Sequence, residues 1–312
     1  MSLRTAIAPF FHAVGHAAGI SLARAKEFSV ARIVTFHAVG VSSCSTAAFT
    51  AQLEYLRRHF HVVPLAELVQ ALRNGRPDIA HWIALTFDDG TRNNGSVAAP
   101  ILKRLGLPAT FFVCPGLVGR GVWLWNHEAR ERLRSLRPTE FAALADSFGR
   151  TGENLEAVIK WLKTLPLHSR SHIERVIRDV TPEFHPSDAQ RTEFDLMNWD
   201  ELKALDPALI TLGAHSTNHP ILANCTANEL ALEVVQCRSL LEQQLARPVE
   251  FFCYPNGDFN PQVATLARVN YTAAVTTQPG FVKPGADLHQ LPRLNCCHSL
   301  PHFAWRLHRP TA

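Results

Sequence analysis

Short apolar runs typical of buried strands alternate along this chain with segments whose apolar residues recur at helical spacing. The strand-like runs lie at residues 33–36, 62–63, 83–87, 109–113, 208–212, 249–254, 272–275 and 291–296. Helical spacing is seen between the first two runs, at Phe49, Leu53, Leu56 and Phe60. A strand followed by a helix, several times over, indicates a parallel sheet with helical crossovers. The sequence therefore predicts an α/β fold whose sheet is closed by residues 291–296.

One of these runs, Ala-Leu-Thr-Phe-Asp-Asp-Gly at residues 84–90, ends in two adjacent carboxylates, Asp88 and Asp89. Neighbouring carboxylates repel each other and are costly to desolvate, so they require a metal ion, a basic partner or open water. Asp-Gly after a strand is also a strong hairpin signal, and taken alone this stretch favours a solvated turn. Asp88 and Asp89 become a candidate functional site only together with a second feature of the chain.

That feature is a pair of histidines, His215 and His219, directly after the strand-like run at 208–212. If the chain turns helically there, residues four apart share one face and both imidazoles can bind one ion. The spacing alone is weak evidence, because the chain contains 16 histidines and a single histidine is usually a structural or surface group. Functional sites collect at strand ends in α/β sheets and barrels, so the two features together favour a metal site.

Three segments carry a resemblance to a known family: Thr-Phe-Asp-Asp-Gly at 86–90, His-Ser-Thr-Asn-His at 215–219 and Phe-Cys-Tyr-Pro-Asn-Gly at 252–257. In this order they resemble the first three motifs of the polysaccharide deacetylase family, also called the NodB-homology domain or carbohydrate esterase family 4. The resemblance extends from about residue 32 to Leu-Pro-Arg at 291–293 and is closest to a branch associated with making surface polysaccharides or lipid-linked glycans.

The resemblance implies a distorted (β/α) barrel with fewer than eight complete units over residues 32–312. Residues 126–193, approximately, are expected to form a helical insertion, either purely structural or acting as a lid or a docking surface. Residues 1–31 are expected to be an N-terminal helix or tail. We read the 312 residues, of which 46% are hydrophobic, as one domain with one large core.

A catalytic metal centre needs three protein ligands and an open position, and Asp89, His215 and His219 offer one carboxylate and two imidazoles. By the resemblance, these three residues hold one divalent ion, with zinc expected and cobalt or nickel compatible. Asp88 is then the general base that takes a proton from the attacking water.

The resemblance also assigns the substrate and oxyanion site to a turn after the strand at 249–254, with the backbone amide of Asn256 as a donor. The residues expected around the substrate are Tyr254, Pro255, Asn256, Gly257 and Trp199. Two further aromatics, Trp123 and Trp125, lie on a glycine-rich loop, where they either stack on sugar rings or simply pack.

The chain departs from the family pattern at two points. Many members have an arginine at the position of Cys253 that pairs with the catalytic aspartate, and we expect Arg293 to replace it, the alternative being a surface arginine. The late histidine that acts as general acid is also missing. His37, at the end of the first strand, is the expected substitute; His298 competes with it, and His37 as a plain structural residue is the other interpretation.

Charge and cysteine content limit the partners and the compartment. Lys and Arg total 31 against 27 Asp and Glu, a net charge of +4 without a long basic run, which argues against a nucleic-acid binder and leaves an anionic membrane surface open. The seven cysteines form no Cys-x-x-Cys pair and indicate no disulfide framework. We therefore expect a cytoplasmic protein, in some settings associated with the inner face of the membrane.

The N-terminal segment, residues 1–31, is moderately apolar but is interrupted by Pro9, His12 and His16. It is too short and polar to span a bilayer, and its similarity to a signal peptide is partial. We expect a helix that lies on the protein or makes peripheral contact with a membrane, with a poorly ordered terminus as the alternative.

Together these observations predict metal-dependent hydrolysis of the N-acetyl group of an amino sugar in a polysaccharide or a lipid-linked glycan. Removal of a formyl or O-acetyl group by the same site is a second enzymatic interpretation. A glycan-binding protein that keeps the barrel without catalysis is the hypothesis from a different class, and the missing arginine and histidine are the features that favour it.

Overall fold

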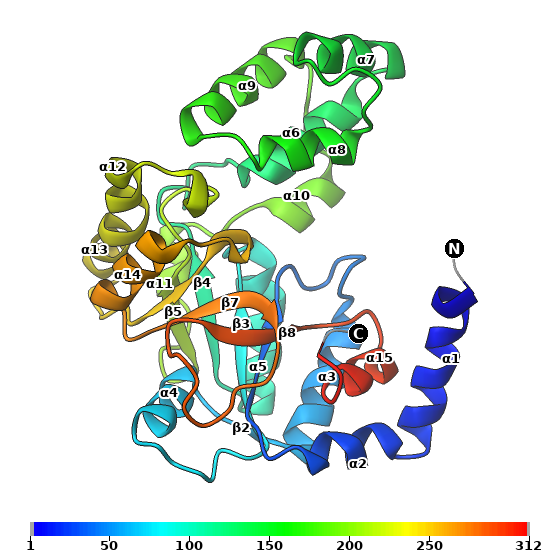
Figure 1. Ribbon diagram of the computed structural model, residues 1–312, viewed down its shortest axis with the longest axis vertical. Coiled ribbons are helices and arrows are strands. Elements are labelled where there is room, and N and C mark those ends of the chain that lie inside the picture. The colour runs from blue at the N-terminus through cyan, green and yellow to red at the C-terminus, as the bar shows by residue number, and fades with distance from the viewer. Residues whose placement is uncertain (1–2, 311–312) are drawn as a thin grey trace.

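The structure, a computed structural model that describes residues 3–310, is built around a closed barrel of seven parallel strands (Figure 1). The strands of the barrel are β1 (Arg32–Phe36), β3 (Trp82–Phe87), β4 (Ala109–Val113), β5 (Ile210–Ala214), β6 (Phe251–Cys253), β7 (Ala273–Pro279) and β8 (Leu291–Asn295). Because β1 pairs with both β3 and β8, the sheet has no free edge there, and the short β2 (His61–Val62) is added outside β3. The predicted α/β barrel with fewer than eight complete units is confirmed.

Helices follow most strands and cover the outside of the barrel, as expected for right-handed crossovers between parallel strands. They are α3 (Thr46–His59), α4 (Leu65–Arg73), α5 (Ala99–Leu105), α11 (Trp199–Lys203), α12 (Ala227–Leu230), α13 (Gln236–Leu245), α14 (Pro261–Asn270) and α15 (Leu300–Arg306). A π-helical turn at Asn94–Ala98 leads into α5, and a second one at Ala231–Val235 joins α12 to α13 into one helical stretch. The first of these turns begins four residues after Gly90 of the Asp-Asp-Gly segment.

Strand alternation divides the core into two layers. Phe36, Phe87 and Phe111 belong to the layer between the strands and the helices, where Phe36 stacks on Phe87 with ring centroids 5.1 Å apart. Residues of opposite parity, such as Ala84 and Phe112, belong to a second buried cluster on the other side of the sheet. The two layers fix the register of each strand, and with it the face on which the residue after each strand emerges.

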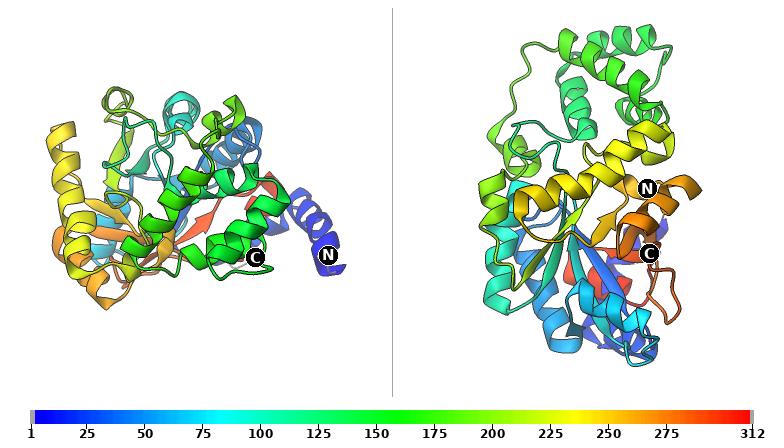
Figure 2. Two further views of the ribbon diagram at one scale, coloured as in Figure 1. Left: turned by 90° about the horizontal axis from the view of Figure 1, so that it is seen from above. Right: turned by 90° about the vertical axis from the view of Figure 1, so that its left-hand side faces the viewer.

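A helical segment joins β4 to β5 and has a small hydrophobic core of its own. It contains α6 (Trp125–Ser135), α7 (Pro138–Ser147), α8 (Leu155–Leu162), α9 (Leu167–Val180) and α10 (Asp188–Phe194). Both views show it standing beyond one end of the barrel (Figure 1, Figure 2). We call residues 125–194 the β4–β5 segment. Because it leaves the barrel at the carboxyl end of β4, it rises from the end at which the candidate site residues lie.

Two helices precede the barrel, α1 (Leu3–Ala17) and α2 (Ile20–Glu27), and both pack against α15 near the other end of the chain. The imidazole of His12 stacks on that of His302, with ring centroids 4.7 Å apart. Among the residues that the structure describes, no helix combines the length and apolar character needed to cross a membrane. All seven cysteines are free thiols.

Candidate active site

The predicted site residues come from loops and strand ends at the carboxyl end of the barrel. Asp88 and Asp89 directly follow β3, and His215 directly follows β5. His37 follows β1 in the same way, while Arg293 lies within β8 and its side chain is fully buried. Since all barrel strands are parallel, their carboxyl ends meet at one rim, and residues separated by up to 256 positions in the sequence are brought together there.

Asp89, His215 and His219 form a buried cluster of one carboxylate and two imidazoles. The Nε2 atoms of His215 and His219 lie 3.4 Å and 3.5 Å from Oδ1 of Asp89, and the ligand atoms of the three residues are all within 4.8 Å of one another. Asp89 and His219 have positive φ angles of 71° and 58°, which non-glycine residues rarely adopt. Such backbone strain concentrates at functional sites, because the surrounding structure must hold it in place.

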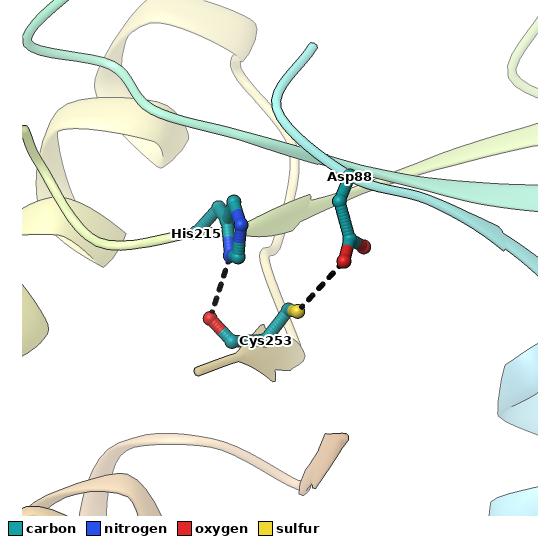
Figure 3. Close-up of side chains that lie close together, drawn as sticks. All are labelled: Asp88, His215 and Cys253. Atoms are coloured by element: carbon teal, nitrogen blue, oxygen red, sulfur yellow. Dashed lines mark hydrogen bonds between the residues drawn. The ribbon is translucent and has the colours of Figure 1, made fainter. Parts of the chain in front are cut away.

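The ring of His215 is oriented by a second hydrogen bond, whereas His219 is positioned through its backbone and its buried Nδ1 has no hydrogen-bond partner within residues 3–310. Nδ1 of His215 donates to the carbonyl oxygen of Cys253 at 2.8 Å (Figure 3). Nε2 of His215 is then the ring nitrogen that faces Asp89. The backbone of His219 is fixed on both sides, because its amide donates to Ser216 Oγ at 3.0 Å and its carbonyl accepts from the indole of Trp125 at 3.0 Å. A second ring hydrogen bond such as that of His215 selects one ring nitrogen as a metal ligand.

Electrostatics also suit this cluster to a cation. Burial opposes ionisation of Asp89, but the hydrogen bond to His215 and the neighbouring imidazoles outweigh it and hold the pKa of this carboxyl below its usual range. Burial and the charge of His215 lower the pKa of His219 to about 3, so this imidazole is neutral. Burial also lowers the pKa of His215, but Cys253 and Asp89 outweigh burial and raise it, so a metal ion would displace a proton there.

The donor set therefore fits a first-row divalent ion such as zinc, cobalt or nickel. A second cluster of potential ligands, Asp88, His215 and Cys253, lies beside the first (Figure 3). The guanidinium of Arg293 contacts both Asp88 and Cys253 Sγ, the latter at 3.2 Å, and burial raises the pKa of the Cys253 thiol. Because a fixed positive charge already neutralises that cluster, the better candidate for a cation site is the cluster formed with Asp89.

Arg293 forms a bidentate pair with Asp88. Its Nη1 and Nη2 donate to Oδ1 and Oδ2 of Asp88 at 2.7 Å and 2.6 Å, and Nη1 also donates to the hydroxyls of Thr35 and Thr86. Burial would raise the pKa of Asp88, but the charge and hydrogen bonds of Arg293 outweigh it and lower this pKa to about 2. Arg293 thus holds Asp88 ionised and in one orientation, and the guanidinium comes from β8 instead of the position of Cys253.

His37 and His298, the two candidates for a proton donor, have different surroundings. Nε2 of His37 lies 3.8 Å from Asp88 Oδ2, and half of the side chain, 52%, is exposed. Its carbonyl accepts a hydrogen bond from Asn94 Nδ2 at 2.7 Å, which anchors the loop after β1. His37 and Asp89 line one cavity of about 160 Å³. His298 is exposed in the segment after β8 and is not among the residues that line this cavity.

The turn at residues 254–257 directly follows the carbonyl that holds His215. Asn256 has a φ of 54°, and its side-chain oxygen accepts a hydrogen bond from Lys163 Nζ of the β4–β5 segment at 2.8 Å. Gly257 has a φ of 76°, and a Cβ there would lie 1.9 Å from Thr277 Oγ1, so only glycine fits. The side chain of Tyr254 points into the core, where its hydroxyl donates to the carbonyl of His289 at 2.9 Å. Pro255 is also buried.

Trp123 and Trp125 are buried and do not offer free faces to a sugar. Trp123 and Trp125 are only 6% and 5% exposed, and the indole of Trp123 donates to Asp195 Oδ1 at 2.9 Å. Trp199 begins α11, packs partly buried against the main core, and is not among the residues that line the cavity beside Asp89. The interpretation of Trp123 and Trp125 as stacking platforms is therefore wrong, because tertiary packing buries both side chains although residues 119–122 of the loop are exposed.

The sequence did not identify which residues the β4–β5 segment contributes to the site. The cavity beside Asp89 is lined on one side by His127 of α6 and by Glu193 and Phe194 of α10. The rings of His127 and Phe194 are stacked, with centroids 4.6 Å apart. The segment falls outside the resemblance to known motifs, so the sequence allowed a lid or a docking surface there without pointing to these three residues.

The fold and the cluster of one carboxylate and two imidazoles together define the class of protein: an α/β barrel with a candidate metal site at the carboxyl ends of its strands. A family model described as polysaccharide deacetylase matches residues 75–274, close to two thirds of the chain. The chain therefore belongs to the polysaccharide deacetylase family. A search of curated protein sequences gave no significant match.

Solved structures of deacetylases share the fold. The Streptococcus pyogenes deacetylase PplD, in complex with acetate, is 19% identical with a TM-score of 0.60, and the match covers 90% of this chain and 99% of that one. IcaB from Ammonifex degensii is 18% identical with a TM-score of 0.60, over 89% and 98% of the two chains. The BpsB deacetylase domain from Bordetella bronchiseptica is 16% identical with a TM-score of 0.55, over 86% and 96%.

Proposed function

We propose that this protein is a metal-dependent N-deacetylase that acts on an acetylated amino sugar within a polysaccharide or a lipid-linked glycan. One observation carries the proposal: an ionised carboxylate, Asp88, is locked by Arg293 beside a separate set of metal-type ligands. A binding protein needs no such pair. Membership of the polysaccharide deacetylase family supports a glycan substrate, and the proposal adds the N-acetyl group and the metal.

Each residue has one task in this proposal. Asp89, His215 and His219 would hold a divalent ion, which supplies Lewis acidity toward the acyl oxygen and toward water. Asp88 accepts the proton of the attacking water; it does so while hydrogen bonded to Arg293, because each carboxylate oxygen has two acceptor sites. The amide of Asn256 donates to the oxygen that becomes negative, and Lys163 keeps the turn that carries this amide in place.

The leaving amine needs a proton donor, and we assign this role to His37. Its imidazole faces Asp88 across 3.8 Å and reaches both the cavity and solvent, so it can be reprotonated between turnovers. His37→Gln is expected to lower kcat by about 10²-fold or more, the usual scale for a lost general acid, with metal content unchanged. His298→Gln is the matched control and should keep its activity. A loss of turnover in His298→Gln with normal turnover in His37→Gln would show that the two roles are exchanged.

The products identify the reaction. Purified protein is incubated with chito-oligosaccharides and with lipid-linked acetamido sugars, and acetate, formate and free amine are each measured. Acetate and amine in equal amounts are expected. Formate with amine from formylated sugars would instead assign a deformylase, and acetate without amine would assign an O-acetyl esterase. Saturable binding of the oligosaccharides without any release would reject catalysis and leave a glycan-binding protein.

The compartment is a further proposal. Seven free cysteines, of which five are buried, need no oxidising environment, and this supports a cytoplasmic protein whose substrate is presented at the inner face of the membrane.

A further inference from the structure

The outer face of α1 is apolar, in contrast to the usual surface helix. Phe10, Phe11 and Val14 are 67%, 55% and 46% exposed, and Ile20 at the start of α2 is 49% exposed. Residues 8–19 contain no Asp, Glu, Lys or Arg. A helix on a water-soluble surface normally presents charged residues to solvent. Adjacent exposed aromatic residues on such a face indicate a surface that another apolar phase covers.

The opposite face of α1, which packs on the protein, is the polar one. His12 stacks on His302 and lies 5.2 Å from the ring of Trp305, and the ring of His16 lies 5.6 Å from that of Tyr55. The ring contacts of His12 and His16 therefore fix the orientation of α1, with its apolar face toward solvent. Both sets of views show α1 at the periphery of the molecule, where it touches the rest of the chain along one side (Figure 1, Figure 2).

The elements that α1 packs against, together with α2, present a basic surface beside it. Arg58 and His59 of α3 line one shallow cavity together with His16 of α1, and Arg309 lies over Trp305 just after α15. Arg24 and Lys26 of α2 are exposed as well. Glu27, paired with Arg24, and Glu54 are the nearby acidic residues. The excess of positive charge complements an anionic surface.

We propose that α1 docks on the surface of an anionic lipid bilayer, with Phe10, Phe11 and Val14 inserted at the boundary between head groups and acyl chains. Exposed aromatics on one helix face flanked by basic residues are the pattern of interfacial helices. A second copy of this chain is the alternative occupant, but two copies joined through α1 about a twofold axis would bring their basic surfaces together. The apolar face and the charge together therefore favour a lipid surface. This inference is independent of the reaction proposed above.

The test is flotation of the purified protein with vesicles of phosphatidylcholine alone and of phosphatidylcholine mixed with phosphatidylglycerol. The unchanged protein should float with the anionic vesicles, and less so at high salt. Phe10→Ser with Phe11→Ser should lower the partition coefficient at least about tenfold, because two exposed rings lose their apolar phase. Val269→Ser is the matched control, since Val269 is 79% exposed on α14, and it should float as the unchanged protein does.

A second variant separates charge from apolar contact. Arg58→Gln should weaken flotation with anionic vesicles by about fivefold and leave binding to phosphatidylcholine unchanged. Equal flotation of the Phe10 and Phe11 double variant and the unchanged protein would overturn the proposal, as would failure of the unchanged protein to bind anionic vesicles. A dimer seen by light scattering that the same double variant dissociates would assign this face to a second copy instead.

Discussion

Replacing Arg293 with alanine is expected to lower both the stability of the protein and kcat/KM. Arg293 and Asp88 are buried, and removing one partner of a buried ion pair leaves the other charge without compensation, which typically costs about 3–5 kcal/mol of unfolding free energy. The pKa of Asp88 should rise, because burial then acts without the opposing guanidinium. Since Asp88 must be ionised to accept a proton, the acidic limb of the pH profile of kcat/KM should move to higher pH.

Arg32 provides the matched control for this experiment. It is also a fully buried arginine, but it donates to the backbone carbonyls of Leu307 and Ala25, away from the site. Arg32→Ala should therefore cost stability without moving the acidic limb. Arg293→Lys should recover part of the stability and of the low pKa, because it keeps the charge but loses the two-pronged contact. An Arg293→Ala enzyme with an unmoved acidic limb and full activity would show that something else holds Asp88.

His215→Ala and His219→Ala are each expected to lose the bound ion and to lower kcat/KM by about 10³-fold or more. The loss is this large because several kcal/mol of charge stabilisation in the transition state disappear with the ion. Elemental analysis should find close to one divalent ion per chain in the unchanged protein. His308→Ala removes another buried histidine and should keep the ion.

The Asp88→Asn variant tests the role of the general base separately from metal binding. It should lower activity about as a lost general base does, by about 10²-fold to 10⁴-fold. It should keep the ion, because Asp88 is paired with Arg293 and is not one of the three residues assigned as ligands. Full metal content in both His215→Ala and His219→Ala would reject the assignment of the ligands.

Much of this site is readable from the sequence, for a physical reason. Short apolar runs bounded by turn residues favour buried strands. If those strands are parallel, their carboxyl ends share one rim, which brings Asp88, His37 and Arg293 near one another. The same rule explains why an arginine on β8 can reach Asp88 when the end of β6 carries Cys253. The spacing of His215 and His219 indicates a common target but not its geometry, since the chain between them turns through the positive φ angle of Ser216.

The contributions of the β4–β5 segment could not be read in this way. His127 and Phe194 reach the cavity because α6 and α10 fold back over the barrel, and no local pattern encodes that placement. The interpretation of Trp123 and Trp125 as exposed stacking residues was wrong for a related reason. Whether an aromatic side chain is exposed depends on what packs on it, and Trp125 is covered by the guanidinium of Arg170, 4.2 Å from the centre of the indole.

The most direct test of a metal-dependent deacetylase is the initial rate of acetate release from an N-acetylated oligosaccharide before and after metal is removed. The protein is stripped with a chelator, assayed, and assayed again after one equivalent of Zn²⁺ or Co²⁺ per chain is returned. Our account predicts release close to background without metal and recovery with it, with free amine formed in equal amount. Acetate release at an unchanged rate by protein shown to contain no metal would contradict it.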